Sequence, residues 1–299
     1  MDNGQLTVIT ADHTLAVPLL RAGEIVALPT ETVYGLSGSA LDESAIGKIF
    51  AAKNRPQDNP LIVHVSGIEM VRDLGLELPP LAEKLAEAFW PGTLTMVLPR
   101  GANCPIPAGV SCGLDTVAVR VPNNAIFLEV INDTMCPLAA PSANLSGRPS
   151  PTTARHVYED LQGRIPLIID GGACSCGIES TVVMFDAGRI QILRPGAITA
   201  EMLSAFGEVV ANTGESPRSP GTRYKHYSPK ARVVVYEGDI PPKAAGESCF
   251  VIANPDTQTL FAKFREFDES GAKEIYVKLP EQSGVGAALY NRIMKAAGL

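Results

Sequence analysis

The side chains best suited to chemistry in this sequence come just after short apolar runs. The first run, Ile25–Leu28, predicts a buried strand, and Pro29 is expected to end it because proline cannot donate a hydrogen bond to a sheet. Hydroxyls, a carboxylate and a phenol follow between Thr30 and Tyr34. Ligands of open α/β sheets usually bind where core strands end, so this stretch is a candidate binding loop. Taken alone, it is equally compatible with an ordinary loop between a strand and a helix.

Polar side chains follow or close several other predicted strands. Together with the first group they are Thr30, Thr32, His64, Thr116, Arg120, Ser142, Asn144, Ser180, Thr181 and Arg194. Two further cations, Lys53 and Arg55, end a helix that is expected to start after the capping residue Asp42 and to stop before Pro56. One cleft at the strand ends would collect all of these groups. The residues alone therefore predict an α/β protein that binds a polar anion.

Each of these candidates also has a purely structural explanation. Lys53 and Arg55 suit the negative end of a helix dipole, and a lone His64 on an apolar strand is more often a core histidine. Arg120 lies in a valine-rich strand and needs an anionic partner there, either a ligand carboxylate or an internal ion pair. Segment 141–150, rich in small donors, could hold phosphate oxygens or simply form turns.

The elements that would position these groups predict two α/β units joined by a linker. Apolar runs alternate with helical patterns up to residue 206, so residues 1–206 are expected to form one domain. Residues 207–230 carry several Gly and Pro residues without apolar periodicity and are expected to be a linker. Residues 231–299 show a compact strand–helix–strand pattern and are expected to form a second domain. Gly284-Val285-Gly286 opens the last helix but lacks the third glycine of a dinucleotide site.

Composition excludes several classes of protein. The chain of 299 residues is 45% hydrophobic and 19% charged, as in ordinary globular domains, and its net charge is −7 without a long basic run. A protein that coats nucleic acid is therefore not expected. The N-terminus does not resemble a signal peptide, and no apolar run approaches the roughly 20 residues of a membrane-spanning helix. We expect a cytoplasmic protein without membrane contact.

The six cysteines are expected to be reduced thiols, because they are scattered and no export signal precedes them. Cys174-Ser175-Cys176 places two thiols close together, but no second Cys or His pair has the spacing of a metal site. No metal ligand is therefore assigned to the side chains. The sequence also lacks a Walker A motif and a Gly-x-Ser-x-Gly nucleophile elbow.

A series of motifs, in order along nearly the whole chain, resembles the L-threonylcarbamoyladenylate synthase family in its two-domain form with a YrdC-type catalytic domain. The matching segments are Pro29–Leu36, Lys53–Pro56, Asn59–Leu61, Trp90–Thr93, Val119–Pro122, Ala140–Gly147, Glu179–Val182, Arg194–Gly196, Ser219–Pro229, Phe264–Asp268 and Gly284–Ala297. The chain departs from the family pattern in a short C-terminal domain and in the Cys-Ser-Cys segment before Gly177.

The resemblance implies a fold and a reaction. The fold is a large N-terminal domain with a twisted, mixed, open sheet flanked by helices, then a linker and a small Rossmann-like βαβ domain. The reaction joins L-threonine, bicarbonate or CO2 and ATP, with Mg2+, into L-threonylcarbamoyl-AMP and pyrophosphate. Other proteins then transfer the threonylcarbamoyl group to an adenosine beside the anticodon of certain tRNAs, and a weak tRNA contact of the synthase itself is also expected.

The family pattern also implies roles for individual residues. It places L-threonine at Thr32, His64, Arg120, Ala140 and Ser180. With Asn144 added from the loop that carries Ser142, ATP is expected at Lys53, Arg55, Asn59, Thr116, Ser142, Asn144, Ser150, Arg194 and Tyr224. Lys53, Arg55 and Arg194 are the expected catalytic cations, because three positive charges suit a triphosphate. The linker segment 219–229 is expected to close over the nucleotide with Tyr224.

Two functions of other classes remain as alternatives. An RNA-binding module of the same fold would use a basic face, against which the net charge of −7 argues. A sensor that binds ATP or threonine without turnover would not need the full set of hydroxyls and cations that the sequence carries.

Overall fold

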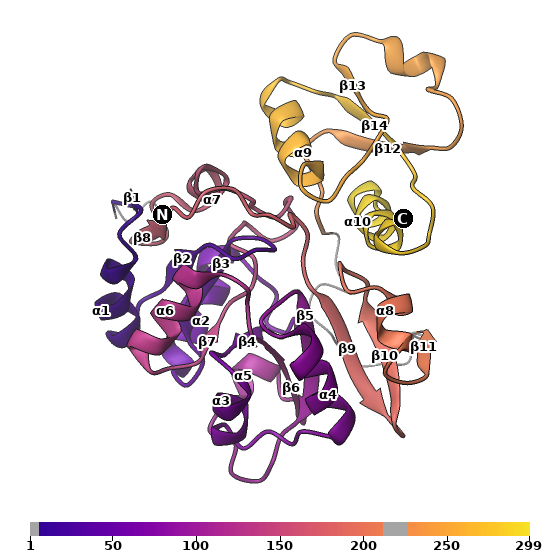
Figure 1. The fold of residues 1–299 in the computed structure, drawn as a ribbon. Coiled ribbons are helices and arrows are strands. Elements are labelled where there is room, and N and C mark those ends of the chain that lie inside the picture. The colour runs from indigo at the N-terminus through magenta and orange to yellow at the C-terminus, as the bar shows by residue number, and fades with distance from the viewer. Residues whose placement is uncertain (1–5, 212–225) are drawn as a thin grey trace.

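The computed structural model describes residues 6–211 and 226–299. Within these residues the strands form an eleven-stranded mixed sheet and a separate three-stranded parallel sheet. Figure 1 shows the large sheet with its helices in the lower part of the view and the C-terminal unit, coloured orange to yellow, above it. The α/β fold class with a large mixed sheet and a smaller parallel one is therefore confirmed.

The elements of the large domain alternate along the chain. Its strands are β1 (Val8–Thr10), β2 (Val26–Leu28), β3 (Gly35–Ser39), β4 (Ile62–His64), β5 (Leu94–Pro99), β6 (Thr116–Arg120), β7 (Leu138–Ala139), β8 (Leu167–Ile169), β9 (Thr181–Asp186), β10 (Arg189–Arg194) and β11 (Val209–Ala211). Its helices are η1 (His13–Leu15), α1 (Ala16–Arg21), α2 (Glu43–Lys53), α3 (Ile68–Asp73), α4 (Pro80–Phe89), α5 (Ala108–Ser111), α6 (Ala125–Thr134), α7 (Ala154–Leu161) and α8 (Ala200–Ser204).

The strand order of the large sheet, β1-β8-β2-β3-β7-β4-β6-β5-β9-β10-β11, brings the candidate residues together at its centre. The parallel neighbours β4 and β6 place His64 directly opposite Arg120. The short β7 pairs with both β3 and β4, and beyond it Ser142 forms an isolated bridge with Gly35. β5 and β9 are also parallel, with Leu94 opposite Thr181, so β9 starts beside the same region.

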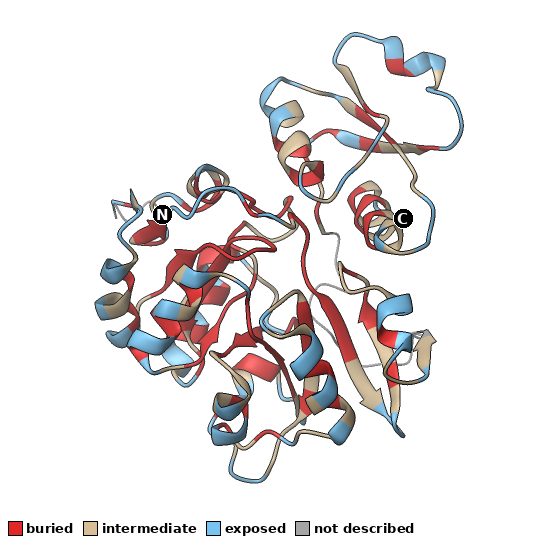
Figure 2. Cartoon of the chain, in the orientation of Figure 1, coloured by how far each residue is buried: buried red, intermediate tan, exposed pale blue. Residues whose placement is uncertain are grey.

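Apolar packing on both faces of the large sheet fixes this arrangement. In β2, Ala27 belongs to the cluster under α2, α4 and α7, whereas Val26 and Leu28 belong to the cluster under α1 and α6, because successive side chains alternate between faces. Figure 2 shows the central strands buried and the outer faces of the helices exposed. A sheet buried on both faces is mostly apolar along its strands, and the candidate residues lie at or near the strand ends.

Helix α2 illustrates how local sequence positions two of the candidate cations. The side chain of Asp42 caps the helix by accepting a hydrogen bond from Ser44 N, as predicted, and Ile49 and Phe50 bury its inner face. Asn54 ends it in the left-handed conformation, with φ of 50°. The chain therefore turns sharply between Lys53 and Arg55.

The C-terminal domain contains β12 (Arg232–Tyr236), η2 (Pro242–Ala245), β13 (Cys249–Ile252), α9 (Leu260–Glu269), β14 (Glu274–Lys278) and α10 (Val285–Ala297). Its strand order is β12-β14-β13, all parallel, with β13, α9 and β14 forming the expected βαβ unit. Helices α9 and α10 lie on the side of the small sheet that faces the large domain (Figure 1).

The structure differs from the sequence-based expectation at two places in the large domain. The expected linker, residues 207–230, starts with β11, which pairs with β10 and so belongs to the large sheet. β3 was not expected as a strand because its sequence, Gly-Leu-Ser-Gly-Ser, lacks the β-branched and aromatic residues that mark strands. In the part of the chain that the structure describes, no helix combines the length and the apolar character needed to cross a membrane.

Candidate active site

A cavity that is partly open to solvent lies where the central strands end. Its lining combines strand ends, the end of α2, the loop after β7 and the segment that enters the C-terminal domain. The lining residues are Thr30, Thr32, Val33, Gly35, Lys53, Arg55, Pro60, Ile62, His64, Arg120, Ala140, Pro141, Ser142, Asn144, Ser146, Gly147, Glu179, Ser180, Arg194, His226 and Tyr227. We call the part around Thr32, His64 and Arg120 the Arg120 end, and the part around Lys53, Arg55, Ser142 and Asn144 the Lys53 end.

Arg120 is 3% exposed, and three protein groups surround its guanidinium. Its Nε donates to Gly92 O at 3.0 Å and its Nη1 donates to Thr32 Oγ1 at 2.8 Å. Its Nη2 lies 2.6 Å from Glu31 Oε1, which also accepts a hydrogen bond from Asn123 N. The approach of Nη2 is too poorly aligned for a hydrogen bond, and Nη2 has no other partner in the described residues. The internal ion pair therefore exists, and it leaves a guanidinium donor available to a ligand.

His64 lies beside Arg120 as a neutral imidazole. Complete burial, together with the Arg120 guanidinium, lowers the pKa of His64 to about 3. Its ring packs 5.1 Å from the Phe127 ring, and its Nδ1 has no hydrogen-bond partner among the described residues. The structural explanation, a satisfied core histidine, therefore does not account for this residue. A buried ring nitrogen without a partner is suited to contact a polar ligand.

The loop after β2 is ordered by its own threonines. Thr30 Oγ1 accepts hydrogen bonds from Thr32 N and Val33 N and donates to Val33 O at 2.7 Å. Thr30 Oγ1 also lies 2.8 Å from Thr32 Oγ1, which receives the Arg120 guanidinium. This loop leads into β3, not into a helix, so it closes a hairpin at the mouth of the cavity.

At the Lys53 end, cations are held by backbone carbonyls. Lys53 Nζ donates to Ser142 O and to Asn144 O, and Arg55 donates to Asn59 O at 3.0 Å and to Pro60 O at 2.8 Å. Burial, with the charge of Arg55, lowers the pKa of Lys53, and burial lowers the pKa of Arg55 to about 10. Cations whose hydrogen bonds go to carbonyl dipoles and not to a directly paired carboxylate retain a positive field, which favours an anionic ligand.

Ser180 and Arg194 connect the two ends. Arg194 donates from Nε to Ser180 O at 3.1 Å and from Nη2 to Ser180 Oγ at 3.2 Å, and Ser180 Oγ lies 2.7 Å from Thr95 Oγ1. Burial lowers the pKa of Arg194, and its charge interacts with both Arg55 and Arg120. A ligand that spans the cavity would therefore pass this pair.

The structure brings most of the predicted site residues into this one cavity. All five residues that were expected to bind L-threonine line it: Thr32, His64, Arg120, Ala140 and Ser180. Five of the expected ATP residues do as well: Lys53, Arg55, Ser142, Asn144 and Arg194. Three others are not among the lining residues. Thr116 is half-buried at the start of β6, Asn59 holds Arg55 through its carbonyl, and Ser150 donates to Glu179 Oε1 at 2.5 Å. Tyr224, like most of the expected lid 219–229, falls outside the described residues.

The sequence-based reasoning assigned no role to several other groups at the cavity. Glu31 pairs with Arg120, and its Oε2 is buried without a hydrogen-bond partner in the described chain. Glu179 lies next to Ser180. His226 and Tyr227 come from the expected linker and line the cavity, and burial and the Arg55 charge lower the pKa of His226 to about 4. The unusual concentration of phenols and cations in this linker was the available signal.

Metal and thiol chemistry find no support in side-chain geometry. Among residues 6–211 and 226–299, no three His, Cys, Asp or Glu residues are arranged to hold a metal ion. Burial raises the pKa of Cys174 to about 12 and also raises that of Cys176. Thiols that stay protonated are weak nucleophiles, so burial disfavours nucleophilic chemistry at these two cysteines.

Known proteins match this chain over nearly its whole length. A family model described as "Telomere recombination" (Sua5_yciO_yrdC) matches residues 18–196, and one described as "Threonylcarbamoyl-AMP synthase, C-terminal domain" matches residues 198–298. The threonylcarbamoyl-AMP synthase of Pyrococcus abyssi is 41% identical over 95% of this chain and 93% of its own. That of Bacillus subtilis is also 41% identical, over 95% and 92%. A crystal structure of P. abyssi Sua5 complexed with L-threonine matches at a TM-score of 0.86 and 36% identity, covering 98% of this chain and 97% of its own.

Proposed function

Because the chain belongs to the threonylcarbamoyl-AMP synthase family, we propose that it joins L-threonine, bicarbonate or CO2 and ATP into L-threonylcarbamoyl-AMP and pyrophosphate. One observation carries the proposal: a single cavity joins a guanidinium suited to an amino-acid carboxylate with three cations suited to a triphosphate. Ser180 and Arg194 lie between them, so the two substrates would meet at this pair.

At the Arg120 end, the proposal assigns the threonine carboxylate to Arg120 and the neighbouring hydroxyl of Thr32. The open Nη2 donor of Arg120 and the unpartnered Nδ1 of His64 support this assignment. A neutral imidazole can accept a hydrogen bond from the substrate amine or hydroxyl. Ala140 and Ser180 complete the expected contacts.

At the Lys53 end, the proposal assigns the phosphates to Lys53, Arg55 and Arg194. Ser142 and Asn144 lie on the loop whose carbonyls hold Lys53, so the loop and its cation would meet the phosphates together. Asn59, Thr116, Ser150 and Tyr224 remain predicted nucleotide contacts. Positive groups that are fixed before the substrate binds stabilise developing negative charge without the cost of reorganisation.

In the proposed chemistry the neutral amine of threonine attacks CO2 to form a carbamate and loses a proton. A carbamate oxygen then attacks the α-phosphorus of ATP, a new P–O bond forms, and the bond to the β-phosphate oxygen breaks to release pyrophosphate. No protein nucleophile is needed. The protein contributes position, because Arg120 and Lys53 hold the reactants in line, and electrostatic stabilisation from its cations.

The site is compatible with Mg2+ that arrives on ATP. The lining offers carbonyl oxygens and cations but no carboxylate cluster at the Lys53 end, and magnesium often binds chiefly through substrate phosphates and water. When bound with ATP, Mg2+ would supply neutralisation of phosphate charge.

The product also indicates what must follow it. A carbamoyl adenylate is a reactive mixed anhydride, so another protein would have to receive it and transfer the threonylcarbamoyl group. We propose that the acceptor is the adenosine beside the anticodon of certain tRNAs, and that separate transfer proteins act downstream.

The proposal is tested by pyrophosphate release from ATP and Mg2+, with threonine and bicarbonate each supplied or omitted. Release that requires both, with serine as a poor substitute, is the expected result. Release that ignores threonine would contradict it. Binding of threonine or ATP without release would indicate a sensor, and a salt-dependent tRNA complex without release would indicate an RNA-binding module.

A further inference from the structure

Two fully buried arginines of the C-terminal domain reach across to the catalytic domain. Arg265 of α9 is 2% exposed and Arg292 of α10 is 0% exposed. A buried arginine needs a compensating anion, and both find one in the other domain: Asp160 of α7 and Glu179 just before β9. Both acceptors also bind atoms of segment 145–150, which follows directly on Asn144.

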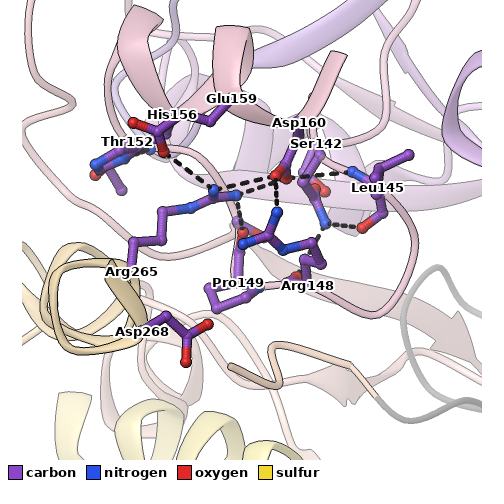
Figure 3. Close-up of polar contacts among 12 residues, drawn as sticks. Ser142, Leu145, Arg148, Pro149, Thr152, His156, Glu159, Asp160, Arg265 and Asp268 are labelled. Carbon is purple, nitrogen blue, oxygen red and sulfur yellow. Dashed lines mark hydrogen bonds and ion pairs between the residues drawn. The ribbon is translucent and has the colours of Figure 1, made fainter. Parts of the chain in front are cut away.

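Arg265 contacts segment 145–150 at Pro149 and through Asp160 (Figure 3). Its Nη2 donates to Asp160 Oδ2 at 2.8 Å and to Pro149 O at 2.6 Å, and its Nη1 donates to Asp160 Oδ1 at 3.3 Å. Asp160 in turn accepts from Leu145 N at 3.3 Å and from Arg148 Nη1 at 2.6 Å. One guanidinium therefore fixes both the start and the end of residues 145–149.

Arg292 is linked to the end of segment 145–150 through Glu179. Its Nε donates to Glu179 Oε2 at 2.7 Å, and its Nη2 donates to Glu179 O at 3.3 Å. The other carboxylate oxygen, Oε1, accepts from Ser150 Oγ. Burial alone would raise the pKa of Glu179, but the charges of Arg292 and Arg194 hold it below its usual value. Arg292 thus orders the end of the segment through Ser150 and the backbone just before Ser180.

Docking of the two domains does not by itself require these arginines. Val33 and Ile178 of the catalytic domain share an apolar cluster with Phe261, Phe264 and other residues of the C-terminal domain. Apolar contacts stabilise such an interface, whereas a buried ion pair contributes little net stability and contributes chiefly a defined geometry. Here the two ion pairs define the positions of segment 145–150 and of Ser180.

We infer that Arg265 and Arg292 are positioning residues: from the C-terminal domain they fix the loop that binds ATP and the start of β9 that binds threonine. This inference rests on the proposed function, since it takes segment 142–150 as the nucleotide loop. Arg265 contacts that segment and its anchor Asp160 on α7, and so acts on ATP alone. Arg292 contacts Glu179, which accepts from Ser150 and directly precedes Ser180, and so acts on ATP and threonine.

The test compares Arg265→Lys and Arg292→Lys in the full-length chain, each retaining the charge but losing the planar fork. The KM for ATP, the KM for threonine, kcat and the melting temperature are measured. Arg265→Lys should raise the KM for ATP about 10- to 100-fold and leave the KM for threonine within about twofold. Arg292→Lys should raise both KM values by about 10-fold or more.

Arg232→Lys is the matched control. Arg232 belongs to the same domain, has a side chain that is 78% exposed, and pairs at 3.6 Å with Glu274 of that domain. All its kinetic constants should equal those of the wild type. A purely structural role of the buried arginines would reduce the folded, active fraction, and so lower the apparent kcat with both KM values unchanged.

If Arg292→Lys fails to fold, the double variant Arg292→Met with Glu179→Gln supplies the comparison for that arginine, because it removes both charges together and leaves no buried ion uncompensated. Raised KM values for both substrates support the inference. KM values within twofold of wild type in folded variants, while the wild type releases pyrophosphate in a threonine-dependent manner, overturn the inference alone. A wild type without such release overturns the proposed function and this inference with it.

Discussion

The two ends of the cavity treat buried positive charge in opposite ways. At the Arg120 end, the guanidinium pairs with the carboxylate of Glu31, and the neighbouring His64 is neutral. At the Lys53 end, Lys53 and Arg55 donate to backbone carbonyls, so their charges are solvated by dipoles and not cancelled. The first end is close to neutral before it binds a ligand, and the second is positive.

This difference matches what each end is proposed to bind. A zwitterionic amino acid has no net charge, and a nearly neutral, geometrically fixed site can bind it without attracting other anions. A triphosphate carries several negative charges, and uncancelled cations attract it over a longer range. The contrast leads to four predictions, each of which would strengthen or weaken it.

The largest effect is expected from Arg120→Ala. It removes the guanidinium proposed to bind the threonine carboxylate. The KM for threonine should therefore rise about 1,000-fold, equivalent to about 4 kcal/mol. ATP binding, measured by calorimetry, should change by less than about threefold, because the cations proposed to bind ATP are untouched.

The same substitution leaves Glu31 buried without its cation, so stability must be separated from binding. The double variant Arg120→Ala with Glu31→Gln removes that uncompensated charge and should recover melting temperature but not threonine affinity. Equal loss of threonine and ATP affinity would contradict the separation of the two ends.

The second largest effect is expected from Lys53→Met. It removes the buried cation that Ser142 O and Asn144 O hold and should lower kcat/KM for ATP about 100-fold, equivalent to about 2.7 kcal/mol. Threonine binding in the absence of ATP, measured by calorimetry, should match that of the wild type. A comparable loss of threonine binding would show that the two ends are one electrostatic unit.

The third effect concerns pH and His64. Its folded pKa of about 3 is below the unfolded value near 6.5, so the unfolded state binds the proton first. Stability should therefore fall as pH decreases through this window, by about 1.5 kcal/mol from His64 alone between pH 6.5 and pH 5.

Chemical denaturation of the wild type and of His64→Gln across that pH range measures this contribution. The variant should show a shallower decline, and the remaining slope would come from partly buried histidines such as His156 and His226, whose pKa values are also lowered. Identical slopes in both proteins would show that His64 is not neutral in the folded state.

The smallest effect is expected from Ser180→Ala, at the junction of the two ends. Its hydroxyl accepts from Arg194 and contacts Thr95, so its loss should raise the KM for both substrates about 10-fold. Steady-state pyrophosphate release, with one substrate varied at a time, gives both values. An effect on only one substrate would move the boundary between the two ends to one side of Ser180.

Much of the fold followed from local sequence. Asp42 marked the start of α2, Pro29 the end of β2, and Val285–Ala297 the last helix, because caps, proline and apolar periodicity act within a few residues. β3 was missed because its sequence lacks β-branched and aromatic residues, and β11 because it has only three residues; both are held by pairing with neighbouring strands.

Some features of the candidate site could likewise be predicted from the sequence, and others could not. The residue types at the strand ends could be read from the chain alone, and the motifs from Pro29 to Ala297 were enough to indicate the family. The sequence left open whether Arg120 meets a ligand or an internal anion, and it gave no sign that Glu179 and Arg292, 113 residues apart, form a pair. These points became clear in the folded structure, because the environment of a buried charge is set by the partners that folding brings to it, and those partners are distant in the chain.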